Sequence, residues 1–255
     1  MRDRDIVVGQ HSIEEALKNP LREHYLLVTT SESLQEFAQK TKINPKTLDL
    51  EIKLLPSHEV QEEAKKLYSE FEFTYHRVPS NMFLVTSPLP LKDLTWLMEE
   101  LEKKPSKILC LDQVTDAHNA AAILRTAAFF GVDALMVSMK GSFGAGPQFH
   151  RIASGASEFI PIVKVASLPR ALTKLENTGV LVVGLSEHAS AEGIQRHKDQ
   201  SLCLVLGAED LGLSHAVSRI LSKTISLQAV GPIKSLNVSV AAALAMEKFF
   251  SPETT

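Results

Sequence analysis

Two polar segments of the sequence follow apolar runs typical of buried strands and carry side chains that could do chemistry. Residues 112–131 include Asn119 and Arg125, which spacing alone explains as a helix cap and a solvated arginine. Residues 204–214 place Glu209 between two glycines, which let the backbone turn tightly and approach a ligand closely. Because open α/β sheets bind ligands beyond the carboxyl ends of their strands, both segments are candidates for a binding site.

A third polar segment stands at the start of a predicted C-terminal helix. Ser235, Asn237 and Ser239 lie within five residues, at the beginning of the alanine-rich run 238–250. One such side chain is enough to cap a helix, so three indicate a further task, such as binding a polar ligand at the helix N-terminus. The phosphate-loop and dinucleotide fingerprints, zinc-type Cys/His spacing and the G-x-S-x-G elbow do not occur in the sequence, and no metal site is predicted.

The scaffold for these segments is a regular alternation of strands and helices from residue 107 onward. Continuous apolar strands alternating with helices favour an α/β domain with a parallel sheet covered on both faces. The helix in the first polar segment is expected to open at Asn119. The predicted strands span 107–111, 134–138, 180–185, 202–207 and 224–227, and the predicted helices span 119–130, 168–177 and 238–250.

The first 78 residues predict a separate, small α/β module. Ser12 is expected to cap its first helix. Pro79, Pro88 and Pro90 break helices and interior strands, so we expect a linker over 79–104, followed by a domain over 105–255. The predicted strands of the module are 6–8, 25–28 and 51–55, and its predicted helices are 11–18, 31–40 and 58–68.

The composition is that of an ordinary globular protein. Of 255 residues, 44% are hydrophobic and 22% charged, and the formal net charge is −3. The charge offers no overall attraction for nucleic acid, so contact with RNA would need local clusters of lysine and arginine. Cys110 and Cys203 lie in apolar runs and are expected to be buried core thiols. The sequence shows no signal peptide and no apolar run long enough to span a bilayer, so we expect a cytoplasmic protein without a membrane partner.

In this order, the three polar segments resemble the three motifs of the SpoU (TrmH-type) RNA 2′-O-ribose methyltransferases of the SPOUT superfamily. The resemblance covers roughly 107–250, and the ordered set ending in Ser-Leu-Asn-Val-Ser-Val-Ala is highly specific. Residues 154–158, Ser-Gly-Ala-Ser-Glu, resemble a family segment between the first two motifs. Residues 9–17 resemble the start of the small RNA-binding module found in many members.

The resemblance implies a fold, a cofactor and an assembly. The C-terminal parallel-sheet domain is expected to contain a deep trefoil knot, and the N-terminal α/β module is expected to bind RNA. The implied cofactor is S-adenosyl-L-methionine, with Gly207, Leu227 and Leu236 at the matching cofactor-binding positions. Members of the family are typically homodimers that pair through the knotted domains.

The resemblance also implies the reaction, a methyl transfer to a ribose 2′-hydroxyl of structured RNA. The matching catalytic positions are Asn119, Arg125, Glu209, Ser235 and Asn237. Arg125 would activate the hydroxyl. Because arginine stays protonated, holding the hydroxyl and a neighbouring phosphate by hydrogen bonds is physically easier than removing a proton. Glu209 and Asn119 would orient Arg125 or the ribose, and Ser235 and Asn237 would shape the site beneath the substrate.

The sequence departs from the family pattern at a few positions. Ala117 and Ala121 replace a proline and a glycine around Asn119, and the cofactor loop reads Leu-Gln-Ala at 227–229 where many members have Ile-Pro-Met. A His-Gln-Gly segment common in the family is represented here by His-Arg-Val at 76–78. The first departures bear on cofactor binding, and the last bears on the choice of RNA target.

Several functions stay open at this point. An rRNA ribose methyltransferase is favoured, because the N-terminal module resembles that of large-subunit rRNA enzymes, and a tRNA ribose methyltransferase is the close alternative. A non-catalytic RNA-binding or ribosome-assembly factor on the same fold, and a nicotinamide oxidoreductase without its glycine fingerprint, are further alternatives. Candidate RNA-contacting residues are Arg2, Arg4, Lys18, Arg22, Arg77 and Arg151.

Overall fold

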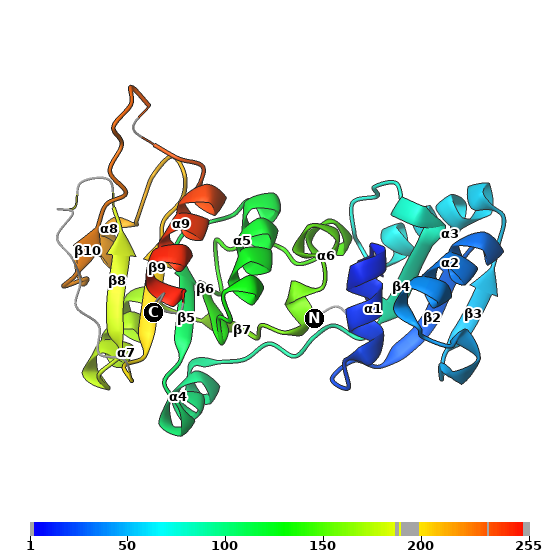
Figure 1. The fold of residues 1–255 in the computed structure, drawn as a ribbon, viewed down its shortest axis with the longest axis horizontal. Helices are drawn as coiled ribbons and strands as arrows, with labels where there is room; N and C mark the ends of the chain where they lie inside the picture. The colour runs from blue at the N-terminus through cyan, green and yellow to red at the C-terminus, as the bar shows by residue number, and fades with distance from the viewer. Residues whose placement is uncertain (1–2, 187–188, 190–198, 234, 252–255) are drawn as a thin grey trace. The chain divides into compact units, whose positions relative to one another are not determined.

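The computed structural model of the chain divides into two compact units, which Figure 1 shows as ribbons. The first unit comprises Met1–Pro90 and Ala145–Phe159, and the second comprises Leu91–Gly144 and Ile160–Thr255. The helices of the described residues include none with the length and hydropathy of a membrane span. The structure describes residues 3–186, 189, 199–233 and 235–251.

The second unit is built on a six-stranded sheet in the order β10-β8-β9-β5-β6-β7, in which every neighbouring pair is parallel. Its strands are short apolar runs, and the central ones are buried on both faces, as a parallel sheet requires. The predicted parallel sheet is therefore confirmed, and Cys110 and Cys203 are buried free thiols in it. The strands are β5 Lys107–Leu111, β6 Ala134–Ser138, β7 Ile162–Val165, β8 Leu181–Leu185, β9 Leu202–Leu206 and β10 Thr224–Ile225.

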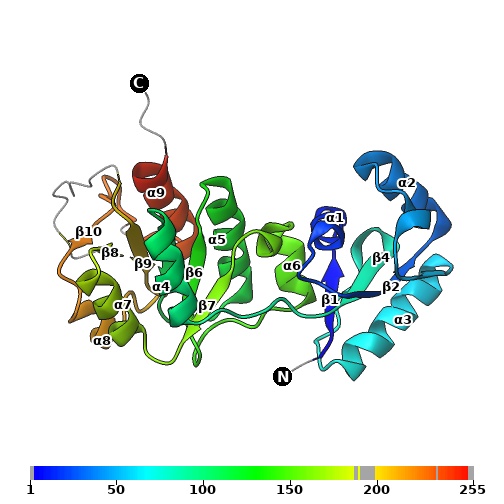
Figure 2. The same ribbon diagram turned by 90° about the horizontal axis from the view of Figure 1, so that it is seen from below.

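Helices cover both faces of this sheet. In Figure 2, α5 and α9 lie together on one side of it, and α4 and α7 lie on the other. The side chains of α4 and α7 share one core cluster with alternate residues of the strands, among them Cys110, Val182 and Val205. The helices are α4 Leu94–Lys103, α5 Ala117–Phe129, α7 Leu168–Asn177, α8 His215–Ser218 and α9 Val238–Phe250.

The helix that carries Asn119 begins earlier than the sequence analysis predicts. Helix α5 starts at Ala117, and the Asp116 side chain caps it by accepting a hydrogen bond from the backbone N–H of His118 at 2.8 Å. Asn119 therefore does not cap the helix and lies within its first turn. Its side chain has no capping role, because Asp116, three positions upstream, is the N-cap residue.

The first unit contains a four-stranded sheet in the order β1-β4-β2-β3. Strand β4 is antiparallel to both neighbours and is buried along its whole length, although it falls in the segment predicted to be a linker. The prolines flank this strand, so they leave its hydrogen-bond ladder intact. The strands are β1 Asp5–Val8, β2 His24–Thr29, β3 Glu51–Leu54 and β4 Met82–Thr86.

Helices pack on both faces and on one edge of the four-stranded sheet of the first unit. Helix α3 packs in a core cluster on one face, α1 and α2 pack in a cluster on the other, and α6 lies against the edge strand β1. The helices are α1 Gln10–Lys18, α2 Ser31–Thr41, α3 Ser57–Glu70 and α6 Pro147–Ala153, and the 3-10 turns are η1 Pro45–Thr47, η2 Pro79–Asn81 and η3 Ala156–Glu158.

The serine expected to cap the first helix has a different task. Helix α1 begins at Gln10 after Gly9, whose φ of 93° is one that glycine adopts readily. The buried Ser12 hydroxyl donates to the backbone oxygen of His150 at 2.7 Å. Ser12 therefore holds the Ala145–Phe159 segment against the rest of the first unit.

A buried ion network joins the same segment to the N-terminal residues. The Arg22 guanidinium contacts Asp5 Oδ2 at 3.0 Å and Glu158 Oε1 at 2.8 Å, and it donates to the Ser87 carbonyl at 2.8 Å. His150 Nε2 lies 2.9 Å from the same Asp5 oxygen. Arg22 is only 4% exposed, so the prediction that Arg22 contacts RNA is wrong. Its donors are engaged by carboxylates and a carbonyl, which makes it a structural residue.

From this network we expect the folded protein to lose stability in acid. Burial alone would raise the pKa of the Asp5 carboxyl, but the charges and hydrogen bonds of His150 and Arg22 outweigh it and hold this pKa well below its usual range. A carboxyl with a lowered folded-state pKa stabilises the fold above its unfolded pKa of about 3.9, and this contribution is lost as the pH falls below that value.

The measurement is the free energy of unfolding in urea between about pH 6 and about pH 3, for wild type and Asp5→Asn. We expect the advantage of the wild type over Asp5→Asn to shrink as the pH falls. The exposed variant Asp3→Asn is the matched control and should follow the wild type. An advantage that is independent of pH would contradict the assignment.

Candidate active site

Three of the predicted catalytic residues form one hydrogen-bonded cluster in the second unit. The Asn237 Nδ2 atom donates to Asn119 Oδ1 at 3.0 Å and to Glu209 Oε2 at 2.9 Å. Asn119 comes from the first turn of α5, Glu209 from the loop after β9, and Asn237 from the N-cap of α9. Side chains far apart in the sequence thus meet at one place, beyond the carboxyl ends of neighbouring strands.

The loop that carries Glu209 is closed by its own backbone. Ala208 and Gly212 exchange two backbone hydrogen bonds, at 3.0 and 2.8 Å. A Cβ atom at Gly207 would lie 2.1 Å from the carbonyl carbon of Gly212, so only glycine fits at this crossing. The two glycines were expected to allow a tight turn and a close approach to a ligand. The structure has the tight turn, at which Gly207 makes room for the backbone of the loop itself.

A buried aspartate ties this loop to the strand that precedes Asn119. The Asp112 Oδ2 atom accepts a hydrogen bond from the backbone N–H of Ser214 at 2.6 Å, and the Asp112 N–H donates to the Leu206 carbonyl at 2.8 Å. Asp112 was not among the residues predicted from the sequence to belong to the site. The available signal was an acidic residue directly after a buried strand, where an unpaired carboxylate would be costly.

Two predicted catalytic residues are exposed and are not bonded to the cluster. Arg125 is exposed on α5, and Ser235 is exposed in the segment before α9. In the part of the chain that the structure describes, no hydrogen bond joins either side chain to Asn119, Glu209 or Asn237. Both side chains are open to solvent, so they are available to contact a substrate.

The predicted cofactor positions flank a segment rich in exposed apolar side chains. Leu227 is half-buried, Leu236 is 46% exposed, and Val230 and Ile233 between them are also exposed. The described residues from 226 to 237 lie outside helices and strands. Uncovered apolar side chains beside irregular backbone suit an adenine ring, which needs both a flat apolar surface and backbone hydrogen bonds. The chemistry of this segment therefore fits the implied cofactor.

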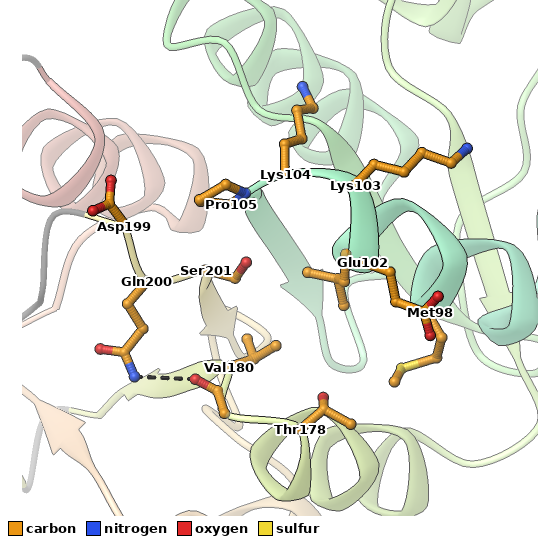
Figure 3. A pocket seen from close by; sticks show the side chains of 12 residues that line it. Met98, Glu102, Lys103, Lys104, Pro105, Thr178, Val180, Asp199, Gln200 and Ser201 are labelled. Carbon is orange, nitrogen blue, oxygen red and sulfur yellow. Dashed lines mark hydrogen bonds between the residues drawn. The ribbon is translucent and has the colours of Figure 1, made fainter.

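A separate groove of about 750 Å³ lies elsewhere in the second unit, and Figure 3 shows its lining. It is bordered by the residues after α4, by those after α7 and by those before β9, among them Pro105, Thr178 and Gln200. Gln200 Nε2 donates to the Gly179 carbonyl at 3.0 Å. The groove lies at the amino ends of the strands, and none of the predicted site residues lines it. We therefore do not assign it to the active site.

The basic residues proposed to contact RNA have varied surroundings. The Arg4 guanidinium stacks 3.6 Å from the centre of the Tyr25 ring, and Lys18 pairs with Glu14 at 2.7 Å. Arg77 and Arg151 are exposed in the first unit and keep their predicted role as a proposal. Arg2 lies outside the described residues.

The fold and the cluster together define an α/β enzyme whose polar residues gather beyond the carboxyl ends of a parallel sheet. The profile of the SpoU rRNA Methylase family matches residues 106–247, which is more than half of the chain. The chain belongs to this family and is an RNA methyltransferase of the SpoU type.

Several known proteins are similar to it. A Staphylococcus aureus protein assigned to the TrmH family of tRNA/rRNA methyltransferases is 26% identical over 96% of this chain and 95% of its own. The 23S rRNA (guanosine-2′-O-)-methyltransferase RlmB of Pseudomonas putida is 38% identical over 57% of this chain and 60% of its own. The crystal structure of the SpoU methyltransferase AviRb from Streptomyces viridochromogenes, in complex with the cofactor AdoMet, matches with a TM-score of 0.73 and 21% identity, over 96% of this chain and 89% of that one.

Proposed function

We propose that the protein transfers a methyl group from S-adenosyl-L-methionine to a ribose 2′-hydroxyl of structured RNA, with rRNA as its substrate ahead of tRNA. The observation that carries the proposal is the Asn119–Glu209–Asn237 cluster. The similarity to a Pseudomonas putida enzyme named for 2′-O-methylation of 23S rRNA supports ribose as the acceptor and rRNA as the target. The fold similarity to a cofactor-bound SpoU methyltransferase supports the choice of cofactor.

The cluster suggests how the chain handles the acceptor hydroxyl. Glu209 accepts the Asn237 hydrogen bond with its Oε2 atom, and among the described residues its Oε1 atom has no hydrogen-bond partner. We assign Oε1 as the acceptor for the ribose hydroxyl, because a fixed carboxylate orients an O–H group and withdraws its proton as the oxygen attacks. When bound, S-adenosyl-L-methionine supplies a methyl group on a positively charged sulfur. Arg125 would hold a neighbouring phosphate, and Ser235 would contact the ribose.

The cofactor site and the assembly are parts of the same proposal. Gly207, Leu227 and Leu236 would hold the cofactor, and the chain would form a homodimer through the second unit. The outward faces of α5 and α9 support this dimer, because Phe129 is 84% exposed and Val240 and Leu244 are also exposed there. The trefoil knot and the cytoplasmic location stay predictions.

We expect Asn237→Asp to lower the rate of methyl transfer by about 10- to 150-fold, the usual worth of a hydrogen bond to a charged group. The aspartate keeps an oxygen that caps α9, but it removes both Nδ2 donors and places an acceptor opposite Glu209. The rate is measured with isotope-labelled cofactor on rRNA and on tRNA, followed by mapping of ribose methylation. The exposed variant Asn177→Asp should keep the wild-type rate.

Cofactor binding separates the proposal from its alternatives. Titration calorimetry with S-adenosyl-L-methionine should show saturable binding to the wild type and none to Leu236→Arg. Methylation of tRNA but not rRNA would make the protein a tRNA enzyme. A folded wild type that binds no cofactor, with or without RNA, would overturn the proposal in favour of an RNA-binding assembly factor.

A further inference from the structure

A serine outside the predicted catalytic set bonds to the side chain at the centre of the cluster. The Asn237 Oδ1 atom accepts two hydrogen bonds from Ser239, one from its backbone N–H at 2.9 Å and one from its hydroxyl at 2.6 Å. The first of these bonds is the capping interaction of α9. The hydroxyl bond is additional, because one backbone N–H is sufficient for the cap.

These contacts exhaust the hydrogen-bonding capacity of the Asn237 amide. Its two N–H donors go to Asn119 and Glu209, and its oxygen accepts both bonds from Ser239. A rotation of the amide by 180° would bring its NH₂ group against the backbone N–H of Ser239 and its oxygen against the oxygens of Asn119 and Glu209, whereas the Ser239 hydroxyl can turn and accept a bond. The Glu209 carboxylate and the Ser239 backbone N–H therefore fix which end of the amide faces Glu209, and the Ser239 hydroxyl adds a second bond that holds the acceptor end in place.

We propose that Ser239 is a positioning residue for methyl transfer, which acts through Asn237 to keep the Glu209 carboxylate in place. This inference rests on the proposed function, in which Glu209 orients the ribose hydroxyl. Ser239 itself touches neither Glu209 nor Asn119 in the described contacts, so its effect must pass through the Asn237 amide. The hydroxyl limits the motion of the acceptor end, and the donor end is then held where Glu209 needs it.

The contact is tested without any assay of activity. Magnetic resonance of the full-length, isotope-labelled protein reports the side-chain NH₂ signals of asparagine, and their loss in Asn237→Asp identifies those of Asn237. We expect Ser239→Ala to shift these signals and to accelerate their exchange with water. Ser239→Thr, which keeps the hydroxyl, should leave the signals near their wild-type positions. Ser222→Ala, which removes an exposed hydroxyl bonded to Glu176, should leave them unchanged.

Kinetics then test the consequence for the reaction. We expect Ser239→Ala to lower kcat by about 2- to 12-fold, with little change in the KM for RNA, and Ser239→Thr to restore most of the loss. Unmoved Asn237 signals in Ser239→Ala would overturn the inference, and so would shifted signals with an unchanged kcat. A wild type that methylates no RNA would overturn the proposed function instead, and the amide signals would still report whether Ser239 holds Asn237.

Discussion

Methyl transfer by Gly207→Ala is expected to fall at least about 100-fold, the usual cost of misplacing a reacting group by an ångström. A Cβ atom at this position would lie 2.1 Å from the carbonyl carbon of Gly212 and 2.3 Å from the backbone nitrogen of Leu213. Both atoms belong to the backbone, so no side-chain rotation relieves the clash. The loop must open, which breaks the paired hydrogen bonds between Ala208 and Gly212 and displaces Glu209.

The rate is measured with labelled cofactor, alongside circular dichroism and urea unfolding to show that both sheets still fold. Gly144→Ala is the matched control, because a Cβ atom there meets nothing within 4 Å. A Gly207→Ala variant with the wild-type rate would show that the closed form of the loop is not needed for the reaction.

The second large effect concerns stability. We expect Arg22→Met to lower the free energy of unfolding by about 3–5 kcal/mol, because it leaves two carboxylates buried without their cation. The Arg22 side chain is fully buried, and it contacts both Asp5 and Glu158. Arg22→Lys should rescue only part of the loss, since one ammonium group cannot reproduce the fork that bonds Asp5, Glu158 and the Ser87 carbonyl together.

Urea unfolding at neutral pH measures the difference. Lys18→Met is the matched control, because Lys18 pairs with Glu14 and Glu15 on the surface and should contribute no more than about 1 kcal/mol. If Arg22→Met and Lys18→Met cost the same, the buried network would not stabilise the first unit.

The sequence predicts the second unit better than the first for a physical reason. Uninterrupted apolar runs such as 108–111 and 202–206 are typical of strands buried on both faces, so composition and order are sufficient to indicate a parallel sheet. In the first unit, prolines close to β4 hide a fully buried strand. The sequence near β4 shows the prolines on either side of it. It does not show the two neighbouring strands, β1 and β2, whose backbone hydrogen bonds complete the sheet.

The Ala145–Phe159 segment could not have been assigned to the first unit from the sequence. Its partners are far away along the chain, as His150 and Asp5 illustrate with a separation of 145 residues. A contact between residues so far apart leaves no periodic pattern in the sequence. Helix α6 has only seven residues and lies among glycines, so it is also hard to predict. The segment also lies inside the stretch that resembles the methyltransferase motifs, which argues for the other unit.

The candidate site was predictable in residue type and only partly in geometry. The resemblance supplied Asn119, Glu209 and Asn237, which the structure brings together. It gave no role to Asp112 or Ser239. The spacing of Ser239 to Asn237 indicated a polar task but not the contact between their side chains, because spacing along the chain does not encode the direction of a side chain toward a particular atom.

The division of the chain has a consequence for its synthesis. The chain passes between the units three times, after residues 90, 144 and 159. A ribosome that makes about 5–20 residues per second must therefore build part of the second unit before the first can be finished. Until His150 and Glu158 have emerged, Arg22 lacks one of its two carboxylate partners and β1 lacks the helix along its edge. Until then the edge of the N-terminal sheet at β1 is uncovered, and we expect a chaperone to be needed most at this stage of synthesis.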